Sequence, residues 1–138
     1  MYKIRNKTYS NIPLEADEQK ELVRWLNSKS IFHYATTNEN NTFKQNRKYA
    51  IIAEQKAKAQ GKKKGVSDLT IFLNDRILFI ELKRQRPILK NGNLGVAENK
   101  PSKEQTEFIN SVNSYSYVYA DVAYGCDEAI KIIEELIK

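Results

Sequence analysis

Two apolar runs joined by a two-residue turn constrain this chain more than any other feature of its sequence. Residues 68–73 and 76–83 are rich in Leu, Ile and Phe, and Asn74-Asp75 between them suits a two-residue hairpin turn. In such a hairpin, facing pairs move outward one residue at a time on each strand. The register therefore predicts that Asp68 lies opposite Glu81.

Polar side chains gather at one end of this hairpin. Facing residues have Cβ atoms about 4.5 to 5.5 Å apart, and at that separation the carboxylates of Asp68 and Glu81 repel unless a cation lies between them. Lys83 follows Glu81 by two residues, so it projects from the same face of the strand. Ile80 and Leu82 project from the opposite, apolar face. The pattern predicts that one aspartate, one glutamate and one lysine converge on a single point of the sheet.

Two carboxylates and a lysine at one point suit a hard divalent cation. Mg²⁺ prefers oxygen ligands and completes its octahedron with waters and substrate phosphate oxygens. The metal would polarise a phosphoryl oxygen and lower the pKa of an attacking water, while the Lys83 ammonium orients that water or offsets negative charge. The alternative is a surface ion pair between Glu81 and Lys83, a common pairing where 29% of residues are charged. The apolar surroundings weigh against it, because buried carboxylates need a compensating metal or partner.

The rest of the chain alternates between helical and strand-like patterns. We expect helices over residues 14–26, 43–60, 102–114 and 127–138, and further strands over residues 30–37 and 117–124. Residues 84–101 lack an apolar period and are expected to form a long mobile loop of the kind that usually serves function. The order α-β-α-β-β-α-β-α predicts an α/β fold in which helices flank a mixed sheet.

The first helix is expected to bring another acid toward the interior. Leu22 and Leu26 define its inward stripe, which continues back through Glu18 and Gln19 to Glu15 in steps of three and four residues. Polar groups at the start of this helix therefore face the interior of the fold, where Glu15 would join the predicted carboxylates.

Length and charge limit the classes of function. The chain has 138 residues, which fits one domain over residues 1–138, and its single cysteine, Cys126, excludes an intramolecular disulfide framework and a cysteine-rich zinc site. No stretch approaches 18 consecutive apolar residues, and residues 1–13 lack a signal-peptide core. We therefore expect a soluble cytoplasmic protein with no membrane partner. A formal net charge of +6 favours a polyanionic partner, most simply nucleic acid.

The second expected helix and the loop after it are rich in lysine. Tyr49, Ile52 and Ala53 are the expected apolar contacts of that helix. The loop Gly-Lys-Lys-Lys-Gly then leads toward Asp68, so its lysines are candidates for phosphate contacts, and a solvated charged face explains the same run equally well. These residues are Lys62, Lys63 and Lys64.

Several motifs together resemble a known nuclease superfamily. Gly65-Val66-Ser67-Asp68-Leu69 followed by Phe79-Ile80-Glu81-Leu82-Lys83 resembles the PD-(D/E)xK nucleases, and specifically the small stand-alone VRR-NUC nucleases of phages and bacteria. Further matches to the family cover most of the chain: Glu15 and Gln19, Asn38-Glu39 and Arg47, Ser102, Gln105 and Phe108, and Gly125, Glu128 and Ala129. The chain departs from the family pattern at Ser67, where proline is usual, and at Ser116, where glycine is commoner.

The resemblance implies a restriction-endonuclease-like fold and Mg²⁺- or Mn²⁺-dependent cleavage of DNA phosphodiester bonds. It implies four metal-binding positions: Glu15, Asp68, Glu81 and the carbonyl group of Leu82. Of these, Glu15 would bind the metal directly or through water. It further implies that Lys83 serves the attacking water and that Gln105 supports the site. Arg47 and Arg84 join the three loop lysines as candidate contacts with nucleic acid.

Three functions are compatible with the sequence. The first is a metal-dependent endonuclease selective for branched DNA such as Holliday junctions, working in DNA repair or recombination as a homodimer, because two sites related by a two-fold axis deliver paired incisions most simply. The second is a non-catalytic basic module that binds nucleic acid. The third is a nickase or restriction-type nuclease on duplex DNA. The dimer contact expected for the first of these functions would come from the last strand, through Tyr115, Tyr117, Tyr119 and Val122, and from the apolar face of the first or last helix.

Overall fold

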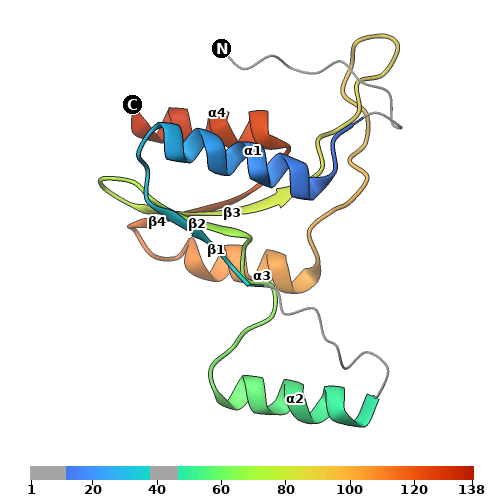
Figure 1. Cartoon of the computed structure of the whole chain (residues 1–138), viewed down its shortest axis with the longest axis vertical. Coiled ribbons are helices and arrows are strands. Elements are labelled where there is room, and N and C mark those ends of the chain that lie inside the picture. The colour runs from blue at the N-terminus through green and yellow to red at the C-terminus, as the bar shows by residue number, and fades with distance from the viewer. Residues whose placement is uncertain (1–11, 38–46) are drawn as a thin grey trace.

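The computed structural model describes residues 12–37 and 47–138. Within them, the elements are α1 (Glu15–Ser28), β1 (His33–Ala35), α2 (Arg47–Ala59), β2 (Leu69–Phe72), β3 (Ile77–Lys83), α3 (Lys103–Val112), β4 (Val118–Tyr124) and α4 (Cys126–Ile137). The strands form one mixed sheet in the order β1-β2-β3-β4, in which only β3 and β4 are parallel (Figure 1). This confirms the predicted α/β architecture and element order. Asn38-Glu39 and the expected start of the second helix lie outside the described residues.

The hairpin of β2 and β3 has the predicted register. Leu69 pairs with Ile80, and the remaining pairs of the two strands follow in step toward the turn at Asn74-Asp75. Extended by one pair beyond Leu69, this register sets Asp68 opposite Glu81. The sheet order also places both strands of the hairpin inside the sheet, between β1 and β4.

The two faces of the sheet are covered by different helices. α1 and α4 lie on one face and α3 on the other (Figure 1). Ile80 and Leu82 of β3 are fully buried in the core beneath α1 and α4, and burial of such a side chain contributes roughly 1.5 to 3 kcal/mol. On the other face, Phe79 meets Phe108 of α3 edge to face, with ring centroids 5.3 Å apart. Because side chains alternate along a strand, Glu81 projects on the α3 face.

Helix α1 has the predicted inward stripe. Leu22 and Leu26 are fully buried, Glu18 is buried as well, and Glu15 at the first turn is partly covered. The Glu18 carboxylate accepts a hydrogen bond from the backbone amide of Cys126, the first residue of α4. The stripe therefore ends in acids that face the interior, and one of them joins α1 to the start of α4.

The predicted packing of the second helix was wrong. No residue of α2 is buried, and Tyr49 and Ile52 are 60% and 52% exposed. Figure 1 shows α2 standing clear of the sheet, beyond α3. The physical reason lies in the helix's own pattern. The apolar stripe from Tyr49 is interrupted two turns later by Lys56, and Ile51 is about 100° away from Ile52 around the helix, so α2 has no continuous face to bury.

Residues 84–101 form the expected loop, but the loop has structure of its own. Ile88 and Leu94 form an isolated antiparallel bridge. The Gly95 amide donates to the carbonyl oxygen of Pro87 (2.7 Å), and Pro87 is fully buried. The loop is therefore folded back on itself and attached to the body at Pro87.

Candidate active site

Glu81 lies at the centre of the candidate site. Its side chain is 2% exposed, and Oε1 accepts a hydrogen bond from Nε2 of Gln105 (2.7 Å) and lies 3.4 Å from Nζ of Lys83. Oε2 is also buried, and no donor in the described part of the chain reaches it. An unpartnered buried carboxylate oxygen is costly. A cation beside Oε2 would offset this cost.

Asp68 supplies the second carboxylate. Its Oδ2 accepts a hydrogen bond from the backbone amide of Leu82 (2.8 Å), which holds the side chain against β3. Its backbone is held on the other side, where the Thr36 amide donates to the Asp68 carbonyl oxygen (2.8 Å) and Thr36 Oγ1 donates to the carbonyl oxygen of Ser67 (2.7 Å). The residue is thus anchored to the strands on both sides of β2.

Glu81 and Lys83 do not form the surface ion pair that was the alternative reading of their spacing. The Lys83 side chain is 12% exposed and that of Glu81 is nearly inaccessible. The Lys83 ammonium group thus lies beside the Glu81 carboxylate and away from bulk water. Its field is therefore screened less than that of an exposed pair.

The electrostatics of the acids are coupled. Burial raises the pKa of Glu81 to about 7, with the charge of Asp68 acting in the same direction and Lys83 opposing the shift. Partial burial also raises the pKa of Glu15, with the charge of Asp68 adding to the shift and that of Lys83 opposing it. Glu15 is therefore close enough to interact with Asp68 and Lys83, as the stripe on α1 predicted. An additional cation would relieve the repulsion among these acids.

The donors present suit Mg²⁺ bound in part by water and substrate. Over residues 12–37 and 47–138, no three His, Cys, Asp or Glu side chains are gathered closely enough to hold a metal by themselves. Asp68 and Glu81 are two oxygen ligands, and Mg²⁺ is commonly held by one or two carboxylates plus waters and phosphate oxygens.

Gln105, which the resemblance alone implied, meets Glu81 because of how α3 begins. The backbone amide of Gln105 donates a hydrogen bond to Oγ of Ser102 (3.1 Å). The backbone amide of Ser102 donates in turn to Oε1 of the Gln105 side chain (2.8 Å). This is a capping box, which the spacing Ser-x-x-Gln signals in sequence. Because the cap uses Oε1, it leaves Nε2 to donate to Glu81. One side chain thus starts the helix and orients the buried carboxylate.

Gly65 holds the segment before Asp68 against the start of α3. Its φ is +81°, and a Cβ at this position would come within 2.3 Å of the backbone carbon of Glu104 and 2.7 Å of the backbone nitrogen of Gln105. Both the conformation and the space therefore require glycine. In the sequence this glycine is only part of a motif, since the backbone contact that demands it is made in the tertiary structure.

The basic residues predicted to contact nucleic acid differ in their surroundings. Arg47 begins α2, and Lys62 and Lys63 are exposed in the loop after it. Lys64 forms an ion pair with Glu54 of α2. Four of the five predicted nucleic-acid contacts thus lie on or beside the helix that stands clear of the body.

The Arg84 side chain is engaged in contacts within the chain itself. Its guanidinium donates to the carbonyl oxygens of Ile12 (2.7 Å) and Pro13 (2.9 Å) and pairs with the carboxylate of Glu98 (2.7 Å). These bonds tie the segment before α1 to the loop after β3. The predicted contact between Arg84 and DNA gains no support from this arrangement.

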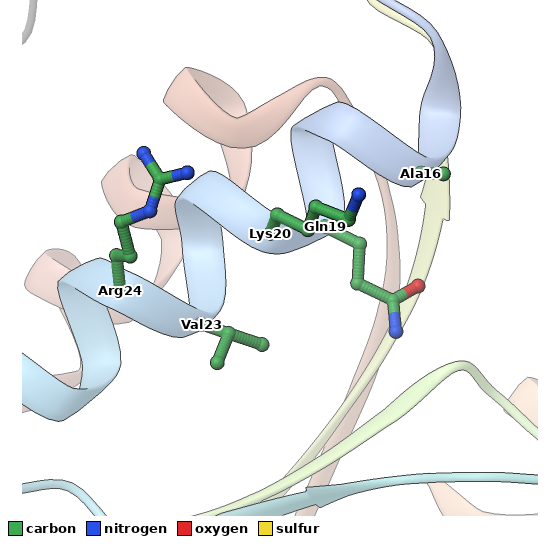
Figure 2. A pocket seen from close by; sticks show the side chains of 5 residues that line it. All are labelled: Ala16, Gln19, Lys20, Val23 and Arg24. Atoms are coloured by element: carbon green, nitrogen blue, oxygen red, sulfur yellow. The ribbon is translucent and has the colours of Figure 1, made fainter.

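A surface hollow of about 470 Å³ lies along α1. It is lined by Ala16, Gln19, Lys20, Val23 and Arg24, and Figure 2 shows these side chains on one side of the helix. The hollow is lined by a single helix and contains none of the predicted catalytic residues.

The fold belongs to the restriction-endonuclease-like class of α/β proteins. Among solved structures, a VRR_NUC domain protein shares it, with a TM-score of 0.65 over 91% of this chain and 88% of that chain at 20% sequence identity. No protein-family model matches the sequence, and comparison with curated proteins gives no match either. Among the described residues, no helix has the length and apolar character needed to cross a membrane.

Proposed function

We propose that this protein is a metal-dependent nuclease of the VRR-NUC family that hydrolyses DNA phosphodiester bonds. One observation carries the proposal. Glu81 is a buried carboxylate with an unpartnered oxygen, set opposite Asp68 and paired with Lys83. The fold shared with a VRR_NUC domain protein supports it. A non-catalytic module would have no evident use for repelling acids in its interior, since they cost stability.

Each residue of the site has a defined role in this proposal. Asp68, Glu81 and the Leu82 carbonyl would hold Mg²⁺ or Mn²⁺, which when bound polarises the phosphoryl oxygen and lowers the pKa of the attacking water. The Lys83 ammonium offsets the negative charge that develops on the phosphate, from a position that needs no rearrangement. Gln105 fixes Oε1 of Glu81 and so leaves Oε2 available as a ligand.

The finer parts of the proposal concern the substrate and the assembly. We assign branched DNA as the preferred substrate and a homodimer as the active species. Arg47, Lys62, Lys63 and Lys64 would contact phosphates, in keeping with the net charge of +6. The exposure of Tyr115 and Tyr117 beside the edge strand β4 supports a partner surface there.

A cleavage assay tests the function. Wild type should cleave at least one of duplex, flap, splayed and four-way junction DNAs with Mg²⁺ or Mn²⁺, and EDTA should stop the reaction. Glu81→Ala and Lys83→Ala should each reduce cleavage by at least about a hundredfold while DNA affinity changes little, because they remove a metal ligand and a charge that acts in the transition state.

The matched controls are Glu107→Ala and Lys103→Ala. These residues form an exposed ion pair on α3 with a separation of 3.9 Å. They repeat the change of charge without touching the buried site, so cleavage should stay within about twofold of wild type. Full activity in both Glu81→Ala and Lys83→Ala would refute the assignment.

A further inference from the structure

Three aromatic side chains form an exposed cluster on β1 and β2. The ring centroid of Phe72 lies 5.4 Å from that of Phe32 and 6.2 Å from that of Tyr34. The three side chains are 39%, 70% and 52% exposed in the order Phe72, Phe32, Tyr34. Large apolar side chains on a sheet are normally covered by another layer. A cluster of this kind left in water therefore indicates a surface that binds something.

The register of the sheet places this cluster on the same face as the carboxylates. Tyr34 pairs with Thr70, and the Phe72 amide donates to the carbonyl oxygen of Phe32 (2.9 Å). Paired residues project from the same face, as do alternate residues of one strand. The face of Phe72 and Thr70 is thus the face of Asp68, and Thr70 and Asp68 are one same-face step of roughly 7 Å apart.

Helix α3 does not cover this part of the sheet face. Its contacts are with the far strands, where Phe108 packs on Phe79 of β3 and Asn113 exchanges hydrogen bonds with the backbone of Ala120 in β4 (2.7 and 2.9 Å). The exposed aromatic cluster thus lies at one end of β1 and β2, and the carboxylate site lies at the other end of these strands, beyond the buried Thr70.

We propose that Phe32, Tyr34 and Phe72 form a stacking platform for unpaired bases of DNA. The inference rests on the proposed function and names its substrate class, which is DNA with unpaired nucleotides beside the cleaved bond. Aromatic rings stack on the π-faces of bases whatever the sequence, and such platforms are a common means of binding single strands. Bases in a duplex are already stacked and do not offer these faces.

Charge favours DNA over a second copy of this chain as the occupant. The chain carries a formal net charge of +6, so a second copy brings a like charge, whereas DNA brings the opposite one. The platform also lies on the same sheet face as the site where the phosphodiester would be cleaved, with the buried Thr70 between them. A single strand that stacks on β1 and β2 can therefore extend toward Asp68 along the same face.

Binding without metal tests the platform apart from catalysis. In EDTA, fluorescence anisotropy would compare a labelled oligothymidylate with a blunt duplex of matched length. The variant Phe32→Leu/Tyr34→Leu keeps apolar side chains and removes the rings. We expect it to weaken oligothymidylate binding about tenfold or more and to change duplex binding by less than about twofold.

Two further variants serve as controls. Phe32→Trp/Tyr34→Trp retains aromatic rings and should bind oligothymidylate at least as tightly as wild type. Leu94→Ala removes another largely exposed apolar side chain, outside the sheet, and should bind as wild type does. If the double leucine variant does not fold, the single variant Tyr34→Leu takes its place, with circular dichroism to confirm its structure.

The outcomes separate this proposal from the function on which it rests. Unchanged oligothymidylate affinity in the leucine variant overturns the platform even if wild type cleaves DNA. A fall in oligomer size in that variant, with unchanged affinity, also overturns it and makes the cluster an interface between copies. In a third outcome, wild type cleaves none of the substrates but the variant shows the expected loss of affinity. This result would refute the nuclease proposal and support the platform.

Discussion

Glu81 is a buried carboxylate, and its titration is measurable. Its pKa in the folded protein is raised to about 7, above the ordinary value of 4.5. The folded metal-free protein therefore holds this proton more tightly than the unfolded chain does. The stabilisation is complete below about pH 4.5 and is lost as the pH rises through about 7.

We therefore expect metal-free wild type to lose on the order of 2 kcal/mol of unfolding free energy relative to Glu81→Gln as the pH rises across this window. Urea unfolding in EDTA at several pH values measures the difference. Mg²⁺ should restore stability to wild type above pH 7 and not to the variant, because a ligand that binds the folded state stabilises it. Parallel profiles for the two proteins would contradict the buried, repelled state of this carboxylate.

Gln105 is expected to act as a positioning residue for Glu81. Gln105→Met removes the donor to Oε1, and we expect a fall in cleavage of roughly tenfold to a hundredfold with a higher Mg²⁺ concentration for half-maximal rate. Ser102→Ala is the matched variant, since it breaks the same capping box at a cost of about 1 kcal/mol and leaves the glutamine amide in place. Equal losses of activity in the two variants would show that Gln105 acts only as a helix cap.

The start of α3 and the loop before β2 form one structural unit, and Gly65 is where they meet. Gly65→Ala places a Cβ against the backbone of α3 and also strains a left-handed residue. We expect a loss of about 3 kcal/mol in unfolding free energy and reduced cleavage, because the collision displaces the segment that carries Asp68.

Gly61→Ala is the control for that variant. Gly61 has a φ of +88°, and no atom lies within 4 Å of the point that an alanine Cβ would occupy, so its substitution adds only the conformational strain. Its cost should be about 1 kcal/mol, with cleavage unchanged. Equal destabilisation of the two variants would show that the contact with α3 contributes nothing.

Helix α2 shows that a local sequence pattern can predict a helix without predicting how that helix packs. Its residues favour helix, and a helix forms, but the sequence prediction that three of its apolar residues would be packing contacts was wrong. Helix formation depends on neighbours within a turn or two. Packing depends instead on a continuous face and on a surface elsewhere in the chain that complements it.

The whole molecule is expected to be a homodimer. Tyr115 and Tyr117 are largely exposed beside the edge strand β4, with ring centroids 5.8 Å apart. Sedimentation equilibrium at micromolar concentration should find about twice the chain mass of 16.0 kDa. Tyr115→Ser/Tyr117→Ser should give the monomer mass, because loss of aromatic contact area weakens an interface core. A wild type that stays at the monomer mass with junction DNA would remove the paired-incision argument.

Short-range periodicity accounts for the features that could be predicted from the amino-acid sequence. Side-chain alternation and a two-residue turn were sufficient to set the register of the hairpin and so to place Asp68 opposite Glu81. The helical period likewise identified the acidic end of the inward stripe on α1. These features follow from backbone geometry, in which each residue constrains only its near neighbours.

Contacts between distant segments could be seen only in the folded chain. The contact of Gln105 with Glu81 spans 24 residues, and those of Arg84 with Pro13 and Ile12 span 71 and 72. The exposure of Phe32 was likewise invisible in sequence, since it depends on which strands α3 covers. Such contacts are set by the packing of whole faces against one another, a property of the assembled layers that no local pattern encodes.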